Sequence, residues 1–159
     1  MKILTVIFTA LILIGCNTSK DVVPKPIYTY CINQTLKPYV FEYLATLEKN
    51  NIKFKDQSFI VMFDIDLNGS SYAGQARGMF NDSLVFVAIN PKAFFSMTEK
   101  EKRILMFHEL SHDIFKIKHT PNIKLMLPRM ISPKESQELD FDKEVKLLMG
   151  YIKINRDGK

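Results

Sequence analysis

The sequence predicts an α+β fold whose centre is a mixed, mostly parallel, twisted sheet of four to five strands. Two nearly continuous apolar runs, at residues 59–67 and 84–89, are typical of strands buried on both faces, as in parallel sheets. Other stretches repeat apolar residues at helical spacing. With 159 residues, the chain is long enough for one domain with a substantial core and too short for two.

The first half of the chain is expected to contain one helix among several strands. Val40, Leu44 and Leu47 recur at the spacing of an amphipathic helix, which we expect over residues 36–50. Glycines punctuate residues 72–80, as they do in an exposed edge strand. The strands expected in this half are 27–32, 52–54, 59–67, 72–80 and 84–89.

The second half is expected to be mainly helical. Thr98 and Glu101 have the spacing of a capping box, in which each side chain caps the start of the same helix. The helix that begins there is followed by a loop over residues 119–122, because Pro121 and the residue before it resist helix formation. Ser132 and Pro133 begin a last helix.

The helix after Thr98 contains the sequence His-Glu-Leu-Ser-His. Because His108 and His112 are four residues apart, they share one helix face, where both can bind one metal ion. Glu109 lies beside them and is placed to act as a general base on a metal-activated water. The chain has three histidines, and the third, His119, falls within the same dozen residues. The pattern predicts a metal centre, and Zn²⁺ is the metal expected from the imidazole ligand set, although other divalent ions can occupy such sites.

The order of elements and this motif resemble the metzincin metallopeptidases, and most of all a minimal matrixin-like domain. That family has the pattern H-E-x-x-H-x-x-G-x-x-H, followed by a turn that bears a methionine. The likeness covers most of residues 27–149 in layout and residues 108–128 in motif, where Leu125-Met126-Leu127-Pro128 is similar to the matrixin turn.

The resemblance implies a zinc endopeptidase with a metal-site helix packed against the sheet, a methionine turn and a C-terminal helix. His108, His112 and His119 would bind Zn²⁺, Glu109 would be the general base, and Met126 would form the apolar floor beneath the metal. A protein or peptide substrate is expected to lie along the edge strand at 72–80, adding a strand to the sheet.

Two departures from the family pattern concern the third histidine. Phe115 stands where the family has a glycine, which normally lets the chain leave the helix at positive φ. His119 comes one residue late, and Lys118 occupies the family spacing. Lysine is a cation at neutral pH and is a poor zinc ligand. The chain is therefore expected to turn back toward the metal without that glycine, near Lys116.

Two alternatives to this function remain open from the sequence. In a gluzincin-type zinc peptidase, Glu138 would be the third ligand, since Glu138 and Asp142 match the E-x-x-x-D spacing on the last helix. The second alternative is a non-catalytic, metal-stabilised lipoprotein binding domain. The retained Glu109 argues against it, because a structural site needs no general base. Asp113, next to His112, is expected to hold an imidazole, to cap a local turn or to be an exposed helix charge.

The N-terminus is typical of a targeting segment. Lys2 precedes a short apolar stretch at residues 3–14, as in a signal peptide. The segment ends in Leu13-Ile14-Gly15-Cys16, which resembles the lipobox of bacterial lipoproteins. The resemblance implies a signal peptide at 1–15, a lipidated Cys16 with a tether to residue 26, and a domain at 27–159. The protein is then expected in the bacterial cell envelope, anchored to a membrane outside the cytoplasm.

Composition limits the other partners. The formal charge of +5 is spread along the chain, with no basic run interleaved with aromatics, so no nucleic acid is expected. After Cys16 the only other cysteine is Cys31, which excludes an internal disulfide in the mature chain. Cys31 is expected to be a small core residue. A monomer is expected.

Overall fold

Four strands form one open sheet in the computed structural model, which describes residues 30–157. Three strands are parallel, and the fourth runs antiparallel at one edge, so the α+β class and the mostly parallel sheet are as the sequence predicts. The signal segment, Cys16 and the tether lie outside the described residues. In sheet order the strands are β1 (Tyr30–Ile32), β2 (Ser58–Phe63), β4 (Leu84–Ile89) and β3 (Gly74–Ala76).

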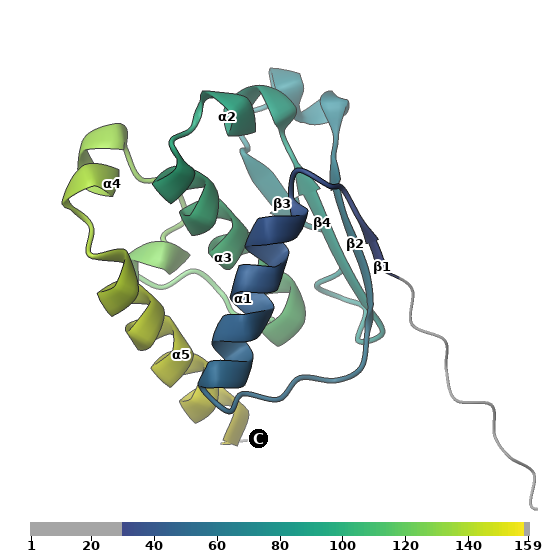
Figure 1. The fold of residues 1–159 in the computed structure, drawn as a ribbon, viewed down its shortest axis with the longest axis vertical. Helices are drawn as coiled ribbons and strands as arrows, with labels where there is room; N and C mark the ends of the chain where they lie inside the picture. Colours follow the sequence, from purple (N-terminus) through teal and green to yellow (C-terminus); the bar gives the residue numbers. More distant parts are fainter. Residues whose placement is uncertain (1–29, 158–159) are drawn as a thin grey trace, which may run out of the picture.

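The helices gather on one side of this sheet (Figure 1). The helix α3 (Glu99–Phe115) packs on β3 and β4, and α1 (Lys37–Lys49) lies beside it. Within residues 30–157, none of the helices combines the length and apolar character that crossing a membrane requires. The remaining elements are α2 (Pro91–Ser96), α4 (Pro133–Glu138), α5 (Phe141–Asp157) and the 3-10 turns η1 (Ile65–Gly69) and η2 (Lys124–Met126).

The core lies between the sheet and these helices and holds α3 firmly. Phe59 and Val87 on the sheet are fully buried, as is Phe107 on α3. Tyr43 of α1 packs edge-to-face on Phe107, with ring centroids 5.0 Å apart. The Tyr43 hydroxyl also bonds the Ser111 hydroxyl at 2.8 Å, and both are buried. Burial of each such aromatic side chain contributes about 1.5–3 kcal/mol, so α3 is among the best supported elements.

Three strand predictions need correction. Residues 52–54 form no strand: the Ile52 N–H instead bonds the Leu47 carbonyl at the end of α1, and its side chain is buried there. β2 ends at Phe63, because the Asp64 carboxylate accepts the Asp66 N–H and begins the 3-10 turn. The edge strand predicted at 72–80 pairs only at Gly74–Ala76, although it does lie at the edge of the sheet.

The helix predictions also differ in two places. Asn90 caps a short helix, α2, which is absent from the helices that the sequence predicts. The single last helix is two helices, since Leu139 is extended and the Asp140 side chain caps the Lys143 N–H of α5. Glu138 and Asp142 therefore lie on different helices, and their expected placement on one helix is wrong.

The expectation that Cys31 is a core residue is also wrong. Its side chain is exposed, because β1 is an edge strand and Cys31 points away from the helices while Tyr30 stacks on Phe59.

Candidate metal centre

The helix α3 begins and ends where local chemistry requires it to. Its N-terminus carries the predicted capping box of Thr98 and Glu101. It ends at Phe115, and the capping residue Lys116 adopts the left-handed conformation (φ 56°, ψ 31°). The turn to the third histidine is therefore made at Lys116, one residue after the position of the family glycine. From Lys116 to His119 the spacing is the same as from glycine to histidine in the family pattern, so the extra residue lies within the helix.

The three histidine rings converge through their Nε2 atoms. The His108 Nε2 lies 3.0 Å from that of His112 and 3.3 Å from that of His119. All three candidate ligand atoms lie within 4.8 Å of one another. Lys118, at the family spacing, is exposed. Within residues 30–157, this trio is the only group of three His, Cys, Asp or Glu side chains that could hold an ion.

Backbone carbonyls set the orientation of two rings. The His108 Nδ1 lies 2.7 Å from the Leu125 carbonyl, and the His112 Nδ1 bonds the Ile117 carbonyl. A carbonyl can only accept, so each Nδ1 carries the proton, and in the neutral ring the Nε2 then holds a lone pair. Lone pairs that face each other at 3.0 Å repel unless a cation lies between them. The arrangement fits a metal ion, since metal-binding histidines commonly donate the other ring N–H to a backbone carbonyl that orients the ring.

The surroundings of His108 and His112 disfavour the protonated, charged form of both rings. Burial, with the neighbouring His112 ring, lowers the pKa of His108 to about 4. Burial also lowers the pKa of His112. Both imidazoles are therefore neutral at pH 7, and neutral imidazole is the form that binds metal.

Glu109 is buried between α3 and the edge strand. Burial raises the pKa of its carboxyl to about 8, although a backbone hydrogen bond from Ala76 opposes the rise. Gly74 makes room for it: a Cβ there would lie 2.9 Å from both the Cγ and the Oε1 of Glu109. A divalent cation nearby would favour the ionised form of this carboxyl. The glycine in the strand thus marks a close approach by another side chain.

The segment after the third histidine holds the other parts of the centre in place. Leu125 supplies the carbonyl that orients His108, and the Met126 carbonyl accepts the Thr120 N–H at 2.9 Å, next to His119. Glu144 of α5, itself buried, accepts the Lys124 N–H at 2.8 Å and fixes this turn. Met126 is fully buried in η2, which packs against α3.

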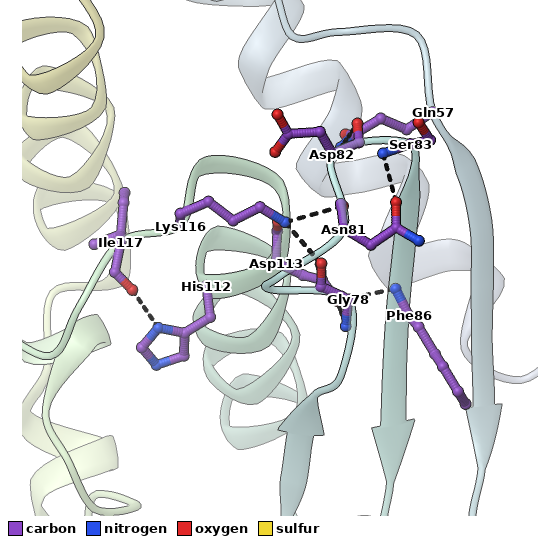
Figure 2. Close-up of polar contacts among 10 residues, drawn as sticks. All are labelled: Gln57, Gly78, Asn81, Asp82, Ser83, Phe86, His112, Asp113, Lys116 and Ile117. Carbon is purple, nitrogen blue, oxygen red and sulfur yellow. Dashed lines mark hydrogen bonds and ion pairs between the residues drawn. The ribbon is translucent and has the colours of Figure 1, made fainter. Parts of the chain in front are cut away.

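Asp113 has none of the three roles expected for it. It is fully buried, and its Oδ2 accepts the N–H groups of Gly78 at 2.8 Å and Phe86 at 2.9 Å. Burial raises the pKa of its carboxyl, and these two hydrogen bonds oppose the rise. The Lys116 ammonium donates to the carbonyls of Gly78 and Asp113 (Figure 2). These contacts, which we call the Asp113–Lys116 clasp, join the end of α3 to the loop after β3.

Several residues of the site were missed by the sequence analysis. Gly74 and Gly78 had a local signal, since glycine inside a strand often marks a close approach, but their partners were not evident. The anchoring carbonyls of Ile117 and Leu125 have no sequence signal, because every residue has a carbonyl. Glu144 is likewise one acidic residue among several on α5.

No family model matches the chain, and no curated protein or solved structure matches it either. The likeness to metzincins therefore depends on the motif and on the geometry of the three histidines.

Proposed function

We propose that this protein is a zinc-dependent endopeptidase of metzincin type. The observation that carries the proposal is the convergence of three imidazole Nε2 atoms, with two rings fixed by backbone carbonyls and Glu109 on the same helical turn. Three protein ligands leave one position for water or substrate, which is typical of catalytic zinc sites, whereas structural sites have four. The donor set of neutral imidazoles fits Zn²⁺.

The chain's own groups then have the following tasks. Bound zinc supplies Lewis-acid activation of a water and of the scissile carbonyl. Glu109 accepts the proton of the attacking water and passes it to the leaving amine nitrogen. The side chain is held against β3 by the Ala76 N–H, in the space that Gly74 leaves. The clasp holds the end of α3 against the loop after β3, and the methionine turn supplies the Leu125 carbonyl that orients His108.

The edge strand supports a peptide as the substrate. β3 is the terminal strand of the described sheet, and Glu109 packs directly against it. Exposed aromatic side chains flank it, Tyr72 before and Phe80 after the strand. A peptide added as a strand here would pass beside the general base, and these rings would provide apolar contacts. A lipid at Cys16 would hold the enzyme at the cell envelope.

Replacement of Glu109 by glutamine tests the catalytic part of the proposal. Glu109→Gln keeps the shape of the side chain and removes the base, so we expect zinc content to stay near one per chain. The rate of peptide cleavage should fall by about 10²- to 10⁴-fold. The measurement pairs metal analysis of the full chain with cleavage of a quenched fluorescent peptide library.

Two outcomes would contradict the proposal. Cleavage at the wild-type rate in Glu109→Gln would exclude Glu109 as the base. Zinc bound by both proteins, with no cleavage by either, would instead favour the metal-stabilised binding domain. Among residues 30–157, no contact favours the gluzincin alternative, since Glu138 is exposed at the end of α4.

A further inference from the structure

The edge strand ends in an irregular hydrogen-bond pattern where it meets the metal-site helix. β3 stops at Ala76, and the N–H groups of Arg77 and Gly78 then both donate to the Phe86 carbonyl, at 2.6 and 3.2 Å. Two successive N–H groups on one carbonyl are the pattern of a β-bulge, in which two residues of a strand oppose one residue of its neighbour. Bulges are frequent at sheet edges and beside active sites, where they end pairing or redirect a side chain.

Asp113 of α3 takes over a hydrogen bond of the sheet at this bulge. In a regular antiparallel ladder, Arg77 and Phe86 would exchange two N–H···O bonds. Here the Phe86 N–H donates instead to the Asp113 Oδ2 at 2.9 Å, and the same oxygen accepts the Gly78 N–H at 2.8 Å. The carboxylate is fully buried. A side chain of the metal-site helix therefore sets the place where the edge strand stops pairing.

Gly78 and Lys116 close this contact from two sides. A Cβ on Gly78 would lie 2.5 Å from the Asp113 Oδ1 and 2.7 Å from the Phe86 nitrogen, which is closer than real Cβ atoms approach. No larger residue fits there without moving the carboxylate or the strand. The Lys116 ammonium donates to the carbonyls of Gly78 at 2.8 Å and Asn81 at 3.4 Å, so the loop is bonded to both ends of the clasp.

The same helix end orients a ring of the metal centre. Lys116 makes the left-handed turn, and the next residue, Ile117, supplies the carbonyl that bonds the His112 Nδ1. His119 follows on the same loop. Figure 2 shows Ile117 beside the His112 ring on one side of the helix end, and the loop after β3 beside Asp113 on the other. A shift of Lys116 would therefore move the carbonyl that orients one ligand and the loop that carries another.

We propose that Gly78, Asp113 and Lys116 are positioning residues that couple the bulge at the edge strand to the ligands His112 and His119. The inference rests on the metal centre of the proposed function. None of the three belongs to the ligand trio, so they would act on the metal only through the turn at Lys116. A disturbance of the bulge should then change the geometry of bound metal. A role limited to stability would leave the metal site of the folded protein as it is.

The first test disturbs the clasp from the side of the sheet. The visible absorption of the full chain loaded with Co²⁺ reports ligand geometry, and competition with a chelator gives the affinity for Zn²⁺; neither readout requires catalysis. Gly78→Ala should change the Co²⁺ spectrum and lower Zn²⁺ affinity several-fold. This is less than the roughly 10- to 100-fold loss on removing an outer-shell partner, because the orienting carbonyl remains. Gly69→Ala is the matched control, since nothing lies within 4 Å of its added Cβ, and it should behave as the wild type.

The second test disturbs the clasp from the side of the helix. Lys116→Met removes the ammonium and keeps a long side chain, so it should reproduce the altered spectrum and the loss of affinity. Lys116→Arg retains a cation and should restore most of both. Lys55→Met is the control, because among the described residues the Lys55 ammonium bonds only Asp82, on the same loop. This pair decides the question if Gly78→Ala lowers the amount of folded protein.

Hydrogen exchange tests the coupling in the opposite direction. Zn²⁺ should slow exchange of the Gly78 and Phe86 amides, which donate to Asp113, more than exchange of the amides of β1. Lys116→Met should reduce this difference, and Lys55→Met should keep it. Equal slowing in all three proteins would contradict the coupling.

The outcomes separate this inference from the proposed function. Wild-type spectra and Zn²⁺ affinities in Gly78→Ala and Lys116→Met, with lowered thermal midpoints, would show that the clasp only stabilises the fold. Equal changes in Lys116→Met and Lys116→Arg would also overturn the proposal, since the cation would then have no positioning role. Altered spectra in a protein that cleaves no peptide would support the clasp and contradict the endopeptidase. Absence of metal binding by the wild type would overturn both.

Discussion

The metal centre has two parts that differ in how they are held. His108 and His112 lie on α3, a helix capped at its start and packed on the sheet, and each ring is fixed by a backbone carbonyl. His119 lies on a loop and is exposed, and among the described residues its ring contacts the rings of His108 and His112 but bonds no backbone carbonyl. The comparison teaches that the helix supplies a preorganised pair of ligands, while the loop completes the site and depends on its turn.

The largest expected effect compares the two parts directly. His108→Ala should lower zinc affinity on the order of 10²- to 10³-fold. The binding free energy of a four-ligand zinc site is about 10–16 kcal/mol in total, and the loss of one ligand removes roughly its share of that total. His119→Ala should lower it less, because the oriented helix pair remains. Competition with a chelator measures both. Equal losses would show that the loop ligand is as well preorganised as the helical one.

A crowding experiment tests whether the helical part is rigid. Gly74→Ala places a Cβ 2.9 Å from the Glu109 side chain, which is buried and has little space to move. We expect the rate of peptide cleavage to fall by on the order of 10- to 100-fold with zinc retained, since small displacements of a catalytic group are costly. Gly69→Ala is the control, because nothing lies within 4 Å of its added Cβ. Similar rates in the two variants would show that Glu109 adjusts freely.

Two substitutions at Lys116 examine the turn between the two parts. Lys116→Ala removes the ammonium contacts of the clasp and keeps a side chain at positive φ, so it should lower the free energy of unfolding by about 1–2 kcal/mol. Lys116→Gly loses the same contacts but relieves the backbone cost, and should be more stable than the alanine variant by about 1 kcal/mol. Urea unfolding with saturating zinc measures both. Equal stabilities would mean that the left-handed conformation carries no cost.

The smallest effect concerns the anchor of α3 on α1. Tyr43→Phe removes the hydrogen bond to Ser111 and should cost about 1 kcal/mol. Burial raises the pKa of Tyr43 above the ordinary value of 10.0, so the folded state holds the proton more tightly than the unfolded state. That contribution to stability is present below pH 10 and is lost as the pH rises further. Above pH 10, the free energy of unfolding should therefore fall less steeply with pH in Tyr43→Phe than in the wild type.

Local signals predicted much of this molecule correctly. The capping box at Thr98 and the strand at 84–89 appear as expected, because caps and buried strands depend on residues that are close in sequence. The predictions failed where tertiary context decides. Residues 52–54 have strand-like composition but no neighbouring strand to pair with, and the last helix breaks where the Asp140 cap begins a new one.

By itself, the sequence determined the fold class, the helix and the three histidines with the glutamate beside them. The tertiary structure decided what surrounds them. Only the folded chain brings Gly74 against Glu109, and only the loop closure made at Lys116 places His119 beside His108. The carbonyl that orients the His108 ring also comes from a later segment, at Leu125. The physical reason is that periodicity and capping act within a few residues, whereas these contacts depend on which strands pair and how the loops close.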